Sequence, residues 1–149
     1  MTWTLLGISR MTDYFYKRNG ALPTNFYGAL LTAAVAPTEA TTTPTGLTQI
    51  TAGNGYTTGG IIVPPSIVGF TSITTTTIVT MVMKDLQWTA AGGPIPLSGG
   101  GARYLILTDD NGTFNSREVY AFWDLTSDRS VSDTQNLNLN DFELRGDTV

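Results

Sequence analysis

The side chains of this chain that could do chemistry are mainly carboxylates, and most of them lie in its last third. Asp109 and Asp110 begin the run Asp-Asp-Asn-Gly. Asp124, Asp128, Asp133 and Asp141 are further candidates after this run. Carboxylate oxygens suit a divalent cation, but the spacing lacks the alternation of an EF-hand loop. A hairpin turn for the first run, and turn caps or solvated positions for the others, are more typical. We therefore predict no metal and no cofactor.

The residue types that most hydrolytic mechanisms need are missing. The chain has no cysteine and no histidine, which removes thiolate nucleophiles and the commonest general base. No serine stands in a Gly-x-Ser-x-Gly motif, and Gly99-Gly100-Gly101 is not followed by the Lys-Ser/Thr pair of a phosphate loop. A hydrolase built on two carboxylates stays formally open, although no carboxylate lies in a distinctive aromatic motif. We expect a protein that is not an enzyme.

Two tripeptides match known recognition motifs. Asn111-Gly112-Thr113 matches the N-glycosylation motif, and Arg145-Gly146-Asp147 matches a tripeptide that some cell-surface receptors bind. Met1 begins a mixed polar segment and not a charged region followed by an apolar run, so we expect no signal peptide. Without secretion, both tripeptides are interpreted as chance matches.

The composition predicts a single β-rich domain. The 149 residues are 41% hydrophobic and only 13% charged, whereas globular proteins average about 25% charged. The polar surface must then consist largely of Thr, Ser, Asn and Gly, and β-branched Thr favours strands. Such a sparsely charged surface favours assembly with other chains. The net charge of −4 and the lone basic pair Lys17-Arg18 argue against nucleic acid as a partner. No apolar run is long enough to predict a membrane span.

Residues 1–20 are predicted to hold a short N-terminal helix. Asn19-Gly20 is a typical helix end. Apolar side chains fall on one stripe, which consists of Trp3, Leu6, Met11, Tyr14 and Phe15. The more ordinary interpretation is a helix that packs on the body of the protein. The functional alternative is a docking helix with exposed aromatics, in which Trp3 and Tyr14 contact a partner.

Residues 33–60 are predicted to form an extended arm. They follow a predicted strand at Phe26–Thr32, and two prolines with consecutive threonines then favour extended, unpaired backbone. Asn54-Gly55 predicts a turn just before the single aromatic residue of the arm. We expect the arm to be ordered mainly by what it contacts. Its candidate contact residues are Pro37, Thr42, Pro44 and Tyr56.

Residues 61–145 are predicted to form the main β body of the single domain 1–149. Ile61–Val68 is broken by Pro64-Pro65, so it is an edge strand or an ordered loop. Further strands are expected at Thr71–Trp88, Arg103–Thr108, Val119–Leu125 and Leu137–Leu144. The alternation of the last strand slips by one residue, which suggests a bulge. Roughly seven or eight short strands with frequent turns predict an antiparallel sandwich or jelly roll.

The order of several segments is more informative than any single motif. The segments are Phe26-Tyr27-x-Ala29-Leu30-x-Thr32, Gly53-x-Gly55-Tyr56, Arg103 to Asp110, Val119 to Leu125, Arg129 to Asp133 and Asp141 to Arg145. Together they resemble small virion structural proteins of tailed bacteriophages, which are described as head decoration (cement) proteins or as tail-fibre-like proteins. The resemblance covers most of residues 1–145, although the Thr/Pro run at 37–45 and the short glycine turn depart from the pattern. It implies a sandwich-like, homo-oligomeric body on a virion shell, with no catalytic residues.

Two functional hypotheses follow from the resemblance. The first is a capsid decoration protein that binds the outer surface of the major capsid protein shell and stabilises it, in a virion assembled in the cytoplasm of the bacterial host. Dimers or trimers would sit on local symmetry axes, with the arm or the N-terminal helix bridging neighbours. The second is a tail or fibre component that contacts a host receptor or glycan through aromatic side chains. The candidates for that contact are Tyr56, Trp88, Tyr104 and Trp123.

Overall fold

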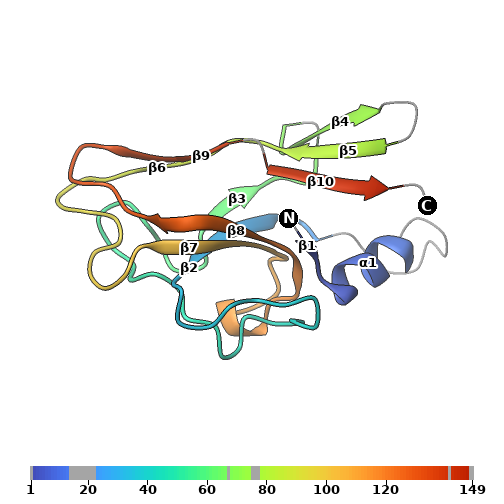
Figure 1. Ribbon diagram of the computed structural model, residues 1–149, viewed down its shortest axis with the longest axis horizontal. Helices are drawn as coiled ribbons and strands as arrows, with labels where there is room; N and C mark the ends of the chain where they lie inside the picture. The colour runs from blue at the N-terminus through green and yellow to red at the C-terminus, as the bar shows by residue number, and fades with distance from the viewer. Residues whose placement is uncertain (1, 14–22, 67, 75–77, 141, 148–149) are drawn as a thin grey trace.

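The computed structural model describes residues 2–13, 23–66, 68–74, 78–140 and 142–147. This part of the chain is mainly β, with antiparallel sheets and one short α-helix, which confirms the predicted fold class (Figure 1). The elements in chain order are β1 (Thr2–Trp3), α1 (Leu5–Thr12), β2 (Phe26–Leu31), β3 (Ile61–Val63), β4 (Phe70–Thr74), β5 (Ile78–Met83), β6 (Leu86–Thr89), β7 (Ala102–Thr108), η2 (Phe114–Ser116, a 3-10 turn), β8 (Val119–Arg129), β9 (Asn136–Leu139) and β10 (Phe142–Asp147).

The central layer is a five-stranded antiparallel sheet in the order β1-β8-β7-β2-β3. β2 lies inside this sheet, where Tyr27 is opposite Ile62 of β3 on one side and Thr108 of β7 on the other. Its sequence is apolar on both faces and five of its six residues are buried, which is typical of a strand that is covered on both sides. The predicted strand at 26–32 is therefore central to the fold. β3 is an edge strand, as its prolines predict.

The second layer contains a long two-stranded ribbon that changes its buried face halfway along. β5 and β6 form one strand of the ribbon, and β9 and β10 form the other. Met83 lies opposite Phe142, and Leu86 lies opposite Leu139, in one continuous register. All four side chains are buried, although an odd number of positions separates the two in each strand. Both strands therefore change phase together, and this shared change replaces the bulge predicted from the sequence.

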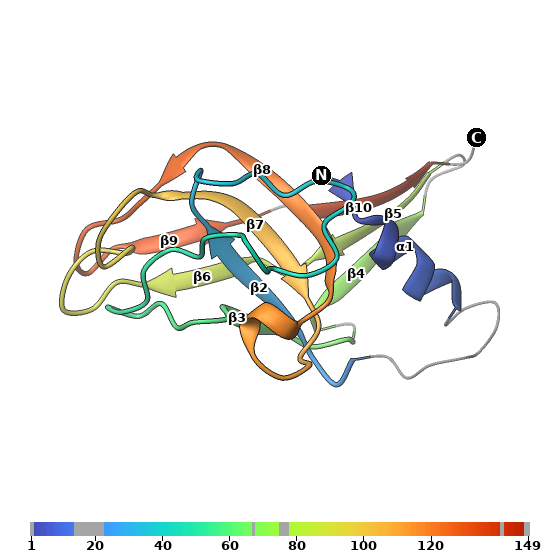
Figure 2. The ribbon, with the colours of Figure 1, turned by 90° about the horizontal axis from the view of Figure 1, so that it is seen from below.

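A three-stranded sheet extends from one end of the ribbon. β4 pairs with β5 on the side opposite β10, which gives the order β10-β5-β4. This sheet reaches towards the end of the molecule where α1 lies, whereas β6 and β9 reach towards the other end (Figures 1 and 2). The region Thr71–Trp88, predicted as one strand region, thus contains most of β4 and all of β5 and β6. The last two belong to the ribbon, and β4 extends the sheet at one end of it.

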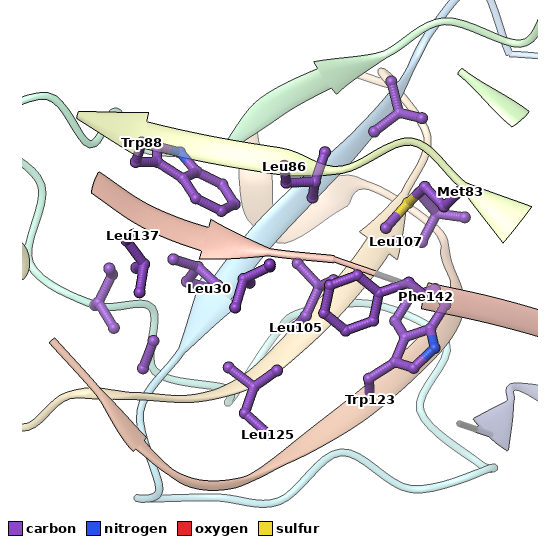
Figure 3. Packing of buried hydrophobic residues seen from close by; sticks show 14 of the residues in the cluster. Leu30, Met83, Leu86, Trp88, Leu105, Leu107, Trp123, Leu125, Leu137 and Phe142 are labelled. Carbon is purple, nitrogen blue, oxygen red and sulfur yellow. The ribbon is translucent and has the colours of Figure 1, made fainter. Parts of the chain in front are cut away.

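The main core lies between the central sheet and the ribbon (Figure 3). Trp123 of β8 packs against Phe142 of β10 with ring centroids 5.3 Å apart. Phe26 of β2 packs edge-on against Phe70 of β4 and Tyr120 of β8, at 5.7 Å and 5.3 Å. Such aromatic pairs add about 0.5–1.5 kcal/mol beyond the area that they bury. They join the three-stranded sheet to the central sheet at the α1 end of the molecule.

A third layer covers the opposite face of the central sheet, and it consists of the segment that was expected to be an arm. Residues 32–50, called the strap below, leave the end of β2, cross this face and return to β2 (Figures 1 and 2). Leu47 of the strap and Phe114 of η2 pack on a second buried cluster in the sheet, formed by Ala29, Leu31, Ile106 and Val119. Two backbone hydrogen bonds tie the strap to β2 and close it on itself, since Ile50 N donates to Leu30 O at 3.1 Å and Thr32 N to Thr48 O at 2.8 Å. In this structure the segment is thus ordered by its own chain.

The connection between β7 and β8 is longer than the tight hairpin predicted for Asp109–Gly112. It contains η2 and is held by the buried carboxylate of Asp109, which accepts hydrogen bonds from Asn111 N at 3.3 Å and Glu118 N at 2.8 Å. Burial raises the pKa of Asp109 above its ordinary value. The carboxylate closes the loop, as aspartates in turns commonly do.

Candidate functional site

Helix α1 is attached to the start of β8 through a buried threonine. Thr4 is fully buried, and its side-chain oxygen caps the helix by accepting a hydrogen bond from Gly7 N at 2.9 Å. The same hydroxyl lies within hydrogen-bonding distance of the backbone carbonyls of Val119 and Tyr120. Thr4 N also donates to Tyr120 O at 3.0 Å. The first turn of α1 is therefore held to the central sheet by polar contacts.

Gly7 lets the helix approach β8 more closely than any other residue type would. A Cβ atom at this position would lie 2.2 Å from the carbonyl oxygen of Tyr120, which is well inside van der Waals contact. The contact face of α1 is thus its glycine face. Apolar side chains on the other faces of this helix are left for the surface.

Two aliphatic side chains of α1 point outward. Leu5 is 64% exposed and Ile8 is 50% exposed. Residues three apart lie on the same side of a helix, so Leu5 and Ile8 form one apolar pair, called the α1 pair below. Leu6 and Met11, which the predicted stripe places together, are half-buried. Figure 2 shows α1 at the outside of the molecule, beyond the end of the central sheet.

Two further contacts, one with the strap and one ion pair, hold α1 in place. Leu5 N, one of the donors left unpaired at a helix start, donates to Glu39 O of the strap at 2.9 Å. Arg10 forms a two-pronged ion pair with Glu118, with Nε to Oε2 at 2.9 Å. The hydrogen bond to Glu118 raises the pKa of Arg10. Arg10 is two positions from Ile8 and five from Leu5, so the ion pair lies on another side of α1 from the apolar pair.

The structure brings some of the predicted contact residues together at the start of β8. Trp3 lies in β1, opposite Ala121, and its half-buried side chain packs on the main core. The carbonyl of Thr42 accepts a hydrogen bond from Val119 N at 2.9 Å, while the Thr42 side chain is exposed. Pro37 and Pro44 of the strap are buried. The segments that carry these residues thus surround the attachment point of α1, with Thr42 the most accessible of them.

Of the other two predicted contact residues, Tyr56 does not join this surface and Tyr14 is not described. Tyr56 is only 1% exposed and belongs to the main core, where its ring packs against Trp88 at 5.9 Å. Tyr14 lies outside the described residues, together with the remainder of the helix predicted to reach residue 20.

The aromatic surface that a glycan-binding function requires is largely buried. Tyr56, Trp88 and Trp123 are all core residues, as the packing interpretation of Trp123 predicted. Tyr104 is half-buried and packs on the second cluster beneath the strap. No stacking platform of the kind expected for a sugar ligand is therefore formed by these four side chains.

Of the four aspartates predicted as candidates in the last third, Asp124 and Asp133 make contacts within the protein, and the side chain of Asp128 is exposed. Asp124 forms an ion pair with Arg103 at 2.8 Å, and this hydrogen bond is the main cause that lowers the pKa of Asp124. Asp133 accepts a hydrogen bond from Gly92 N at 2.8 Å, and Asp141 lies outside the described residues. Within the described ranges, no three His, Cys, Asp or Glu side chains are grouped to hold a metal ion.

The tripeptide Arg145-Gly146-Asp147 lies within β10. Its backbone pairs with Thr80, Val79 and Ile78 of β5, so it forms part of a sheet and is not the tip of a loop.

Sequence reasoning missed the α1 pair because it ranked helix residues by apolar stripe alone. The signal was the sequence Thr-Leu-Leu-Gly-Ile, in which a cap residue and a glycine three positions later mark the buried face. If Gly7 is taken as the contact position, Leu5 and Ile8 lie together on a side of the helix that is turned away from the sheet.

Comparison with protein-family models, with curated proteins and with solved structures found no match to this chain. Among the described residues, no helix is both long and apolar enough to cross a membrane.

Proposed function

We propose that this chain is a non-enzymatic virion structural protein of the tailed-bacteriophage type, and that it decorates the capsid. In this proposal it binds the outer surface of the major capsid protein shell and stabilises it there. The proposal draws on the resemblance of the segment order, on the sandwich-like β fold and on the sparsely charged surface. One structural observation carries it, namely the outward-facing α1 pair on a helix that is held to the body by Thr4 and Gly7.

The α1 pair suits a contact with another protein because it is apolar, exposed and rigidly placed. The helix is attached through Thr4 and Gly7, and Leu5 and Ile8 stay largely outside its contact with the body. Exposed apolar residues on an ordered element are a common feature of interaction sites.

The energy available from this contact is modest for a single copy. Full burial of one aliphatic side chain contributes roughly 1.5–3 kcal/mol, and only the exposed 64% of Leu5 and 50% of Ile8 remain to be buried. The α1 pair alone would therefore give weak binding. A decoration protein overcomes this by acting as an oligomer on a repeating lattice, where linked contacts multiply the affinity of each one. Self-association is accordingly part of the proposal.

The copy number of this chain in purified virions tests the proposal. A protein that coats the shell is present in numbers comparable with the major capsid protein, and quantitative mass spectrometry of intact particles measures this ratio directly. A count of only a few copies per particle would overturn a decoration role and favour a tail or fibre component. Binding of the isolated protein to a glycan array would point the same way.

A further inference from the structure

Strand β4 has an unprotected outer edge. β4 is the last strand of the sheet β10-β5-β4, and its other side faces away from the body of the protein (Figure 1). Proteins usually protect such edges with charged residues, prolines or very short strands, because an open row of backbone donors and acceptors invites pairing with another chain. The chain has no charged residue anywhere from Pro64 to Met83, so β4 lacks a charged protecting residue. The side chains of Thr71 and Ser72 are exposed.

The other edge strands of the described sheets, β6 and β9 included, are shorter than β4 or carry charged residues. β3 has only three residues and runs into Pro64-Pro65. β1 is two residues long. β10 carries charged residues in its sequence, and its outer side is occupied at Glu143, whose carbonyl accepts a hydrogen bond from Trp123 Nε1 at 3.4 Å. The contrast singles out β4.

The hydrogen-bonding pattern shows which backbone groups of β4 point outward. Lys84 N donates to Gly69 O at 2.8 Å, so Gly69 and Lys84 form a hydrogen-bonded pair of the antiparallel strands. Hydrogen-bonded and non-hydrogen-bonded pairs alternate along the strands. With Ser72 opposite Met81, it follows that Ser72 belongs to a non-hydrogen-bonded pair and directs its N–H and C=O away from β5.

The same alternation directs the backbone groups of Phe70 and Thr74 outward. The N–H of Phe70 indeed donates to Ser66 O at 2.8 Å, on the outer side of the strand. Among the described residues, the carbonyl of Phe70 and both backbone groups of Ser72 and Thr74 therefore have no backbone partner. Phe70 fixes the strand on the core through its edge-on contact with Phe26, so the edge is presented by an anchored strand.

We propose that β4 pairs antiparallel with β4 of a second copy of this chain, about a two-fold axis at Ser72. Two three-stranded sheets then become one continuous sheet across the two copies. Outward groups must meet outward groups, and placing Ser72 opposite Ser72 also places Phe70 opposite Thr74, where the carbonyl of Phe70 can accept a hydrogen bond from Thr74 N. A shift of two residues in either direction loses a pair at one end.

A second copy is the occupant that the chemistry of this edge favours. Two-fold contacts bring the same surface together from both copies, so any charge on the edge would meet a like charge in its partner. An edge without charges removes this repulsion, and Thr and Ser side chains in neighbouring strands pair favourably. The dimer does not require a shell, so the proposal stands or falls separately from capsid binding. On a shell it would link two α1 pairs in one particle-binding unit.

Single cysteines test the pairing and its register, because the chain has no cysteine of its own. Directly opposed, hydrogen-bonded residues have Cα atoms about 5.5 Å apart, within the roughly 4.4–6.8 Å that a disulfide spans. Ser72→Cys should therefore form a covalent dimer under mild oxidation. The matched control is Thr71→Cys, whose two copies would lie about 8 Å apart in this register and should stay uncrosslinked. Equal crosslinking of both variants, or none with Ser72→Cys, would overturn the proposal.

Sedimentation of the full-length protein in solution supplies a second, independent readout. The unmodified chain should sediment as a dimer. Ser72→Pro removes an outward N–H and keeps the bonds between β4 and β5, so it should raise the dimer dissociation constant about tenfold or more, as expected for two symmetric hydrogen bonds. Ser72→Ala keeps the N–H and should remain a dimer. A monomeric unmodified chain, or a Ser72→Pro dimer as tight as the original, would contradict the proposal. If Ser72→Pro does not fold, the cysteine comparison decides.

Discussion

The hydroxyl oxygen of Tyr56 lies 2.9 Å from the backbone nitrogen of Leu30, in the centre of the fold. β3 pairs with β2 only from Phe26 to Gly28, so the N–H of Leu30 has no strand partner on that side. The tyrosine hydroxyl takes the place of the missing strand, and Gln49 Nε2 donates to the same oxygen at 2.6 Å. Residues far apart in the sequence thus close the central sheet together with the strap.

Replacing Tyr56 by phenylalanine should destabilise the protein without changing its fold. The change leaves the buried N–H of Leu30 without an acceptor, which costs about 1–3 kcal/mol of unfolding free energy. Denaturant unfolding measures the difference. Tyr104→Phe, at a half-buried position outside the main core, is the matched control and should have a smaller effect. An unchanged midpoint for Tyr56→Phe would show that the hydroxyl does not support β2.

Stability should decrease at high pH because two buried tyrosines resist ionisation. Burial raises the pKa of Tyr56 and of Tyr120 to about 12, whereas an unfolded tyrosine titrates near 10. The folded state holds these protons more tightly, so the contribution to stability is complete below about pH 10 and is lost between about pH 10 and 12. The loss reaches at most about 1.4 kcal/mol per pH unit for each tyrosine.

Denaturant titrations over this pH range measure that slope. The Tyr56→Phe variant retains only the contribution of Tyr120, so its stability should fall about half as steeply as that of the unmodified chain, following the linkage of proton binding to folding. Identical slopes for the two proteins would contradict a protonated, buried Tyr56.

Replacing Gly7 by alanine should loosen α1 from the body. The added Cβ would lie 2.2 Å from Tyr120 O, and forcing an extra methyl group into a packed site costs about 1–3 kcal/mol. Limited proteolysis should then cut the N-terminal segment faster, while the β body keeps its spectrum. The Ser9→Ala variant, changed on the exposed side of the same helix, should be cut by the protease at the same rate as the unmodified chain. Equal protection in the Gly7 variant would mean that the close contact is dispensable.

Replacing both members of the α1 pair by serine should weaken shell binding and leave the fold intact. Leu5 and Ile8 contribute little to the folded core because they are 64% and 50% exposed. Losing about 1 kcal/mol or more of apolar burial at each position corresponds to roughly a tenfold or greater loss of affinity for the pair. Co-sedimentation with shells of the major capsid protein measures the change.

Leu97→Ser is the matched control for that experiment. Leu97 is 48% exposed and belongs to the loop at the end of the molecule opposite α1 (Figures 1 and 2). The substitution removes a similar exposed aliphatic side chain from a different surface, so the variant should bind shells normally. Equal loss of binding in the control and in the double variant would indicate a general effect of apolar surface and not a site at α1.

The strap makes deletion a poor test of shell contact. Removing residues 33–45 would take away the carbonyls of Glu39 and Thr42, which accept hydrogen bonds from Leu5 N and Val119 N, so the deleted protein is expected to lose stability whatever the strap contacts. Point changes at exposed strap positions such as Thr42 are the informative alternative.

Local patterns in the sequence predicted much of the secondary structure and little of its arrangement. The apolar run at 26–31, the prolines after β3 and the turn at Asn54-Gly55 each have a local physical cause, and the structure has a strand, an edge and a turn there. The bland composition of residues 33–60 did not predict the strap. The strap is ordered by contacts with residues such as Leu30 and Leu31, and composition alone does not show which residues a segment contacts after folding.

The candidate site was harder to predict than the fold. Sequence reasoning placed the function at the N-terminal segment and at the Thr/Pro run, and the structure does bring these segments together at Val119–Ala121. It chose aromatic and proline residues, which the structure largely buries, because large side chains are common in interfaces. The exposed Leu5 and Ile8 could be recognised only once the glycine contact of α1 had fixed which face is covered.

The position of this chain on an intact particle tests the central claim most directly. A density map of the virion by electron cryomicroscopy should show the β body repeated over the outer surface of the head, with α1 turned towards the major capsid protein and the α1 pair covered. Density confined to the tail, or a head-bound body whose α1 faces solvent, would contradict the account.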